Sequence, residues 1–202
     1  MRERNRLETW SLIHDQASGM ALDVGLHKTT VEAIADAAGV SKRTFFNYFP
    51  TKEDAVLGTQ PPTLPDEAVA AFRADGDGDL FARTVRLMGA VIRSMFPAAS
   101  QAVRRKELKR RYPELDRVIM GHLTASELLV ESILLDRYEE ADPLLAQAGI
   151  SGGREGAQAL LMLTSTAMRF AFKRDPSVFS ADDHQTINDA IETFREVIKS
   201  TL

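Results

Sequence analysis

Lys42, Arg43 and Asn47 carry side chains that can form paired hydrogen bonds with the edges of DNA bases. In the major groove, arginine and lysine pair with guanine and asparagine pairs with adenine, while an apolar edge such as that of Phe46 can meet a thymine methyl group. Helical spacing places these side chains on the outer side of a helix predicted over residues 42–49. This helix could therefore read a nucleotide sequence.

Capping signals predict a second helix and a tight turn in front of it. Thr29 is followed three residues later by Glu32, which predicts a capping box at the start of the first helix. Gly39 suits the left-handed turn that ends that helix. Ser41 is a good N-cap for the next helix, and Pro50 stops it. The pattern is typical of a helix-turn-helix.

The local charge supports the same interpretation. Residues 37–52 contain three bases, Lys42, Arg43 and Lys52, and no acid, which gives +3 on a chain of net charge −4. Residues 1–58 hold seven bases and eight acids, a net charge of 7 − 8 = −1, so the positive face must be local. A helical hairpin inside an ordinary bundle would explain the spacing of Ala35 and Gly39, but it would not require this charge.

The stretch resembles the tetracycline-repressor (TetR) family of transcriptional regulators. The resemblance covers about the first 58 residues and is carried by TTVEAIADAAGVS, by RTFFNYF, a variant similar to that of actinobacterial members, and by Lys52 after Pro50-Thr51. It implies phosphate contacts from Thr30, Thr44, Tyr48 and Lys52, and base contacts from Lys42, Arg43, Phe46 and Asn47. The family usually has tyrosine at the position of Phe46, so a hydroxyl contact is missing here.

The whole-chain composition is that of a soluble globular protein. Hydrophobic residues make up 44% and charged residues 27% of the 202 residues, and there is no cysteine. We find no uninterrupted apolar run of about 18 residues and no apolar core near the N-terminus. We therefore expect a cytoplasmic protein with no membrane partner.

The remaining chain predicts an all-α protein of about nine helices, a three-helix domain followed by a larger bundle. Three prolines within residues 58–65 place a boundary between an N-terminal domain, 1–58, and an effector-binding and dimerisation domain, 59–202. Helical periodicity predicts helices over residues 5–25, 66–73, 80–96, 101–112, 113–137, 156–172 and 182–200.

Catalytic patterns are not found in the sequence. The four histidines lack metal-ligand spacing, and there is neither a phosphate-binding glycine loop nor a nucleophile elbow. We therefore expect no enzyme, catalytic residue, metal or cofactor. The six bases within residues 104–111 leave three interpretations open: a solvated helix face, contacts to the phosphates of an effector such as a coenzyme A thioester, or non-specific DNA contacts.

The sequence and the resemblance together favour a homodimeric repressor that binds a palindromic operator and is released by a small hydrophobic or amphipathic effector, with a fatty-acyl thioester as one candidate. The alternative is a helical small-molecule binder or enzyme without specific DNA binding. Predicted pocket residues are Phe81, Met88, Met95, Phe96, Met120, His122 and Leu129. Predicted dimer-interface residues are Leu160, Leu163, Ala167, Phe170, Ile187, Ile191, Phe194 and Ile198.

Overall fold

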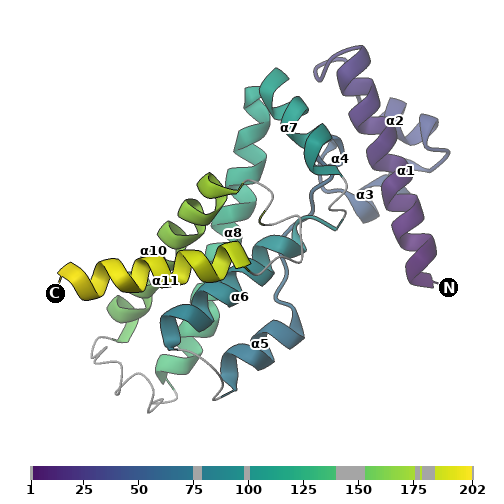
Figure 1. Cartoon of the computed structure of the whole chain (residues 1–202). Coiled ribbons are helices and arrows are strands. Elements are labelled where there is room, and N and C mark those ends of the chain that lie inside the picture. The colour runs from purple at the N-terminus through teal and green to yellow at the C-terminus, as the bar shows by residue number, and fades with distance from the viewer. Residues whose placement is uncertain are drawn as a thin grey trace. The chain divides into compact units, whose positions relative to one another are not determined.

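The structure, a computed structural model, describes residues 2–74, 79–97, 101–139, 153–175, 178 and 185–201. Every regular element in these ranges is helical (Figure 1), which confirms the predicted all-α class. The elements are α1 (Arg2–Asp23), α2 (Val31–Ala37), α3 (Lys42–Tyr48), α4 (Lys52–Leu57), α5 (Asp66–Arg73), α6 (Leu80–Ser94), α7 (Ala102–Arg111), the 3-10 turn η2 (Pro113–Leu115), α8 (Asp116–Glu139), α10 (Gly153–Arg174) and α11 (Gln185–Thr201).

The chain divides into two compact units that do not follow the chain order. Unit 1 joins Met1–Pro61 to Met95–His122, and unit 2 joins Pro62–Ser94 to Leu123–Leu202. Residues 95–122 thus pack with the N-terminal helices, although they come after the predicted boundary at residue 58. The division into domains 1–58 and 59–202 therefore remains a prediction.

The core of unit 1 is built from α1, the helix-turn-helix and α7. Trp10 and Ile13 of α1 are buried with Phe45 and Phe49, and the ring centroids of Trp10 and Phe49 lie 5.4 Å apart. Leu108 of α7 and the nearby Leu115 are fully buried members of the same cluster. A helix-turn-helix of such short helices therefore depends on neighbours from both sides in sequence for its hydrophobic core.

Local capping explains where the short helices begin and end. Ser41 Oγ accepts a hydrogen bond from Thr44 N at 3.0 Å, as the sequence predicts, and Thr51 Oγ1 accepts one from Asp54 N at 3.0 Å. Gly39 and Gly58 adopt φ of +64° and +63° at the ends of α2 and α4.

The predicted capping box at Thr29 is wrong by one residue. Thr30 is the N-cap of α2, and its Oγ1 accepts a hydrogen bond from Ala33 N at 3.2 Å. Thr29 is buried instead and donates its hydroxyl hydrogen bond to the Gly25 carbonyl at 3.0 Å, inside the preceding turn. Two adjacent threonines offer the same local signal, and the hydrogen bond from Thr29 to Gly25, four residues earlier, leaves Thr30 as the N-cap.

Basic side chains of α7 attach this helix to α1 and α4. Arg104 Nη1 binds Asp15 Oδ1 at 2.6 Å, and Arg111 Nη1 donates to the Leu22 carbonyl at 2.5 Å. Arg105 is buried, donates from Nε to the Leu57 carbonyl at 2.9 Å and lies 4.4 Å above the Phe96 ring. Burial lowers the pKa of Arg105 to about 10, so the group is still charged at neutral pH. Much of the basic cluster is thus structural rather than a solvated face.

In unit 2, helix α6 packs against α5, α10 and α11. Gly89 of α6 allows close approach, because a Cβ added there would lie 3.0 Å from Ile187 Cδ1 of α11. The Phe194 ring of α11 lies 5.9 Å from Phe170 of α10 and 6.4 Å from Phe81 of α6. These contacts make α6 the central helix of the unit's described part.

Most predicted helices are confirmed within a few residues, and α5 matches its predicted bounds. Helix α10 begins three residues before the predicted Gly156. The start predicted at Asp182 lies outside the described residues. By length and composition alone, the segment Pro113–Asp136 could cross a membrane, but that signal is weak because the core helices of soluble proteins also give it. Val130 and Leu134 of this segment are fully buried within the fold.

Candidate nucleic-acid interface

Helix α3 exposes four of the predicted DNA-binding side chains on one side. Lys42, Arg43, Phe46 and Asn47 are all exposed, whereas Phe45 is fully buried against the core of unit 1. Positions i, i+1, i+4 and i+5 of a helix share one face, so these four side chains can meet one surface together. We call these four residues the recognition face.

Phe46 is the unusual member of the recognition face. Its side chain is 55% exposed, and its ring meets the Phe45 ring edge-on, with centroids 5.4 Å apart and an interplanar angle of 88°. Such an edge-to-face pair is favourable and limits how the exposed ring can turn. Phe46 therefore presents an exposed apolar edge of limited mobility on the recognition face.

The predicted phosphate-binding residues differ in exposure. Thr44 and Tyr48 are half-buried, and Thr44 Oγ1 lies 2.8 Å from Ser41 Oγ. Thr30 is exposed at the start of α2, where its hydroxyl oxygen accepts a hydrogen bond from Ala33 N and its hydroxyl group donates to the Glu32 carboxylate. Hydroxyl groups at these positions suit phosphate oxygens, which accept hydrogen bonds but carry no base identity.

Lys52 has a structural contact that the sequence analysis missed. Its Nζ donates to the carbonyl oxygens of Leu26 at 3.0 Å and Thr29 at 2.9 Å, which fixes the loop before α2. An ammonium has three donors, so one remains for a phosphate. The carbonyl partners are neutral, but Glu53 Oε1 also lies 4.0 Å from Lys52 Nζ, so an adjacent carboxylate offsets part of the positive charge of Lys52.

Glu32 was also missed as a member of this surface. Its Oε1 lies 2.6 Å from Lys42 Nζ, and the hydrogen bond from Lys42 lowers the pKa of the Glu32 carboxyl. The charge sum for Lys42, Arg43, Lys52 and Glu32 is therefore 3 − 1 = +2, less than the +3 counted along residues 37–52. A window along the sequence cannot detect an acid contributed by the preceding helix.

We expect Glu32→Gln to strengthen DNA binding several-fold at low salt, because it releases Lys42 from an anionic partner and removes repulsion from phosphates. A fluorescence-anisotropy titration at several salt concentrations measures this, with Asp36→Gln, an exposed acid on the same helix, as the control for charge alone. Equal effects of the two variants would show that the contact with Lys42 is irrelevant.

A buried carboxylate joins the end of this region to α8. Burial opposes ionisation of Asp54, but hydrogen bonds from His122, Thr51 and Thr59 outweigh it, so the Asp54 pKa is lowered. Asp54 Oδ1 lies 2.6 Å from His122 Nε2, and Thr59 Oγ1 donates to the same oxygen at 3.1 Å. His122, predicted as a pocket residue, thus binds a carboxylate of α4.

The seven predicted pocket residues fall in both units. Met88 and Met95 are buried core residues, Phe96 lies under Arg105, and Met120 is 59% exposed. Phe81 is half-buried against Phe194, and Leu129 is half-buried on α8. Neither of the two hollows described below is lined by any of the seven, whose role in ligand binding remains a prediction.

The predicted dimer-interface residues divide by exposure. Leu160, Ala167, Ile187 and Ile191 are buried within the chain itself, and Leu163 and Phe194 are half-buried. Phe170 and Ile198 are exposed, as are three apolar residues that were not selected: Met162, Phe172 and Val197. The buried four stabilise the packing of unit 2, so within this group only the exposed five present most of their apolar surface to solvent.

Residues 13–57 match the family model of "Bacterial regulatory proteins, tetR family". A solved structure from Shewanella sp. PV-4, titled as a tetR family transcription regulator, is 19% identical, with coverage of 92% of this chain and 95% of that one and a TM-score of 0.39. The fatty acid degradation regulator FadR from Bacillus halodurans is 20% identical, with coverage of 89% and 94% and a TM-score of 0.34. No curated protein matches the chain.

Proposed function

We propose that this chain, whose residues 13–57 match the tetR family model, is a DNA-binding regulator of that family and a cytoplasmic repressor. It binds a palindromic operator as a homodimer and is released by a small-molecule effector. The observation that carries the proposal is the recognition face. It combines a guanine-pairing arginine, an adenine-pairing asparagine and an apolar edge on one capped helix whose inner side is buried.

The division of labour on the DNA follows from exposure and chemistry. Arg43, Asn47 and Phe46 are exposed on α3 and face the base edges, while Lys42 joins them once it leaves Glu32. Thr30, Thr44, Tyr48 and Lys52 contact phosphates and set the position of α3 in the groove.

The proposed dimer rests on apolar side chains that the single chain leaves exposed on α10 and α11. Met162 is 72% and Val197 57% exposed, together with Phe170, Phe172 and Ile198. Exposed apolar residues gathered on two helices favour a partner surface. A symmetric dimer through these helices would present two recognition faces to successive major grooves, roughly 34 Å apart.

Release requires two states of the dimer that differ in affinity for the operator, and an effector that prefers the weak-binding one. To change the population from mostly bound to mostly released, that preference must amount to about 5 kcal/mol. The proposed effector is a small amphipathic molecule bound by residues 59–202.

A salt-dependent gel shift on the DNA that flanks the protein's own gene tests the proposal. We expect Arg43→Ala and Asn47→Ala each to relax preference at individual base pairs, at a cost of about 1–3 kcal/mol. Lys52→Ala should weaken binding to all duplexes alike and lower the salt slope by about 1, provided that thermal unfolding shows the loop before α2 intact.

The matched control is Arg117→Ala, which removes an exposed arginine outside the recognition face. A preference for one duplex that survives Arg43→Ala and Asn47→Ala unchanged would exclude α3 as the base-reading element. If no duplex binds in preference to others, the chain is instead a helical small-molecule binder.

A further inference from the structure

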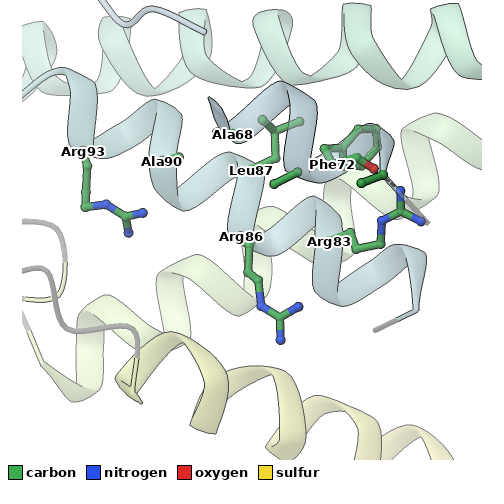
Figure 2. A pocket seen from close by; sticks show the side chains of 9 residues that line it. Ala68, Phe72, Arg83, Arg86, Leu87, Ala90 and Arg93 are labelled. Carbon is green, nitrogen blue, oxygen red and sulfur yellow. Dashed lines mark hydrogen bonds between the residues drawn. The ribbon is translucent and has the colours of Figure 1, made fainter. Parts of the chain in front are cut away.

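Arginine side chains line two hollows of unit 2 that share part of their walls. The larger has a volume of about 400 Å³ (Figure 2) and is lined by Ala68, Ala71 and Phe72 of α5, by Ala74, and by Arg83, Arg86, Leu87, Ala90 and Arg93 of α6. The second, of about 350 Å³, is lined by Arg86, Arg93, Ile187 and Asn188. Arg86 and Arg93 belong to both.

Arginines supply the charged side chains in the described lining of the larger hollow. Three of its described lining residues are arginines and none is acidic. Arg86 and Arg93 are seven residues apart, which is two helical turns, and Figure 2 shows their side chains extending from the same side of α6. A guanidinium presents a planar fork of donors that matches the two oxygens of a carboxylate or a phosphate.

Arg83 adds a buried charge to this wall. Its side chain is 6% exposed, Nη2 donates to the Phe72 carbonyl at the end of α5, and the guanidinium lies 5.5 Å from the Phe72 ring centroid. Its Nε is buried and makes no hydrogen bond. Because this atom is buried, it lies beneath the surface of the hollow, and Arg83 contributes its positive charge to the wall rather than this N–H.

The remaining wall is apolar and made of small residues. Four alanines leave the space open, and Phe72 and Leu87 supply larger apolar surfaces. A few fixed polar groups in an otherwise apolar concavity are the usual composition of a small-molecule site. A fully hydrated inorganic anion would gain nothing from this apolar wall.

We propose that the larger hollow binds a small organic anion, in which a carboxylate or phosphate contacts Arg86 and Arg93 and a compact apolar group packs on the alanines, Leu87 and Phe72. The role of this anion as the effector of the repressor rests on the proposed function, whereas its binding in the hollow does not. The site thus differs from the methionine-rich set predicted from the sequence.

Isothermal titration of the full-length protein with four probes tests the chemistry. Benzoate and phenyl phosphate carry both an anion and an apolar ring, benzyl alcohol lacks the charge, and acetate lacks the ring. We expect the first two to bind at least about tenfold more tightly than the last two, and the tighter of the two identifies the head group. Benzyl alcohol binding as tightly as benzoate would overturn the proposal.

Two variants locate the binding. Arg86→Gln combined with Arg93→Gln should weaken benzoate or phenyl phosphate binding about tenfold or more, whereas Arg117→Gln, an exposed arginine that lines neither hollow, should not. Ala90→Leu should also weaken binding by filling the space without changing charge. Circular dichroism and thermal unfolding check that each variant is folded. Unchanged affinity in folded forms of both the double variant and Ala90→Leu would overturn the site.

A gel shift with and without the anion separates this inference from the proposed function. Failure of the ligand-free protein to bind any duplex specifically refutes the DNA-binding function, while the titrations still decide the site. We expect the tighter anion to release wild-type protein from DNA and to leave the double arginine variant bound. An anion that binds the hollow but never changes DNA affinity would overturn its role as effector.

Discussion

Leu108→Ala should lower the free energy of unfolding of unit 1 by about 2–5 kcal/mol, the usual cost of a cavity left by a fully buried leucine. Leu108 lies on α7, outside the family-matched segment, yet belongs to the same buried cluster as Trp10 and Phe45. Trp10 is the only tryptophan and is 4% exposed, so its fluorescence in a urea titration reports on this unit alone.

The control for this prediction is Val103→Ala on the same helix. Val103 is 82% exposed, so its truncation should change stability by less than about 0.5 kcal/mol. The difference between the two variants measures how much α7 stabilises the helix-turn-helix. Comparable urea midpoints for the two variants would mean that α7 is not needed for that core.

Met162→Asp should convert the proposed dimer to monomers and abolish operator binding at concentrations where the wild type binds. The side chain is 72% exposed in the single chain, so the fold should tolerate aspartate, but an apolar interface would bury an unpaired carboxylate. A monomer contacts one half-site only and loses the contribution of the second recognition face. Sedimentation equilibrium at micromolar concentration and a gel shift measure the two effects.

Val103→Asp introduces the same charge at an exposed apolar position outside α10 and α11, and it should leave both assembly and DNA binding intact. A Met162→Asp protein that still sediments as a dimer would exclude α10 from the interface. A wild-type protein that is monomeric at this concentration would exclude the proposed dimer altogether.

For the helix-turn-helix, most helix ends could be predicted from the sequence because local interactions determine them. Helix caps and left-handed turns involve residues no more than about four positions apart, so the neighbouring sequence is sufficient to locate them. The residues concerned are the N-caps Ser41 and Thr51 and the turn glycines Gly39 and Gly58. The same local logic misplaced one cap by a residue, because Thr29 and Thr30 differ only in what surrounds them after folding.

Contacts between distant segments were not predictable in this way. Lys52 binds carbonyls 23 and 26 residues earlier, and Arg105 binds the Leu57 carbonyl across 48 residues. From the sequence alone, a lysine or an arginine at either position is compatible with several roles, including phosphate binding. On α10 and α11, helical periodicity found apolar stripes but could not distinguish the side that packs on α6 from the side left exposed.

The discontinuous composition of unit 1 has a consequence for the order in which the chain folds. Its core needs Leu108 and Leu115, which leave the ribosome only after the intervening residues 62–94, including all of α6, have been made. Closing an intervening loop of this length costs conformational entropy, and contacts between segments far apart in sequence form more slowly than local ones. During synthesis the N-terminal helices therefore remain partly unpacked until α7 has been made. The DNA-binding surface reaches its full stability only when residues up to about 122 are available.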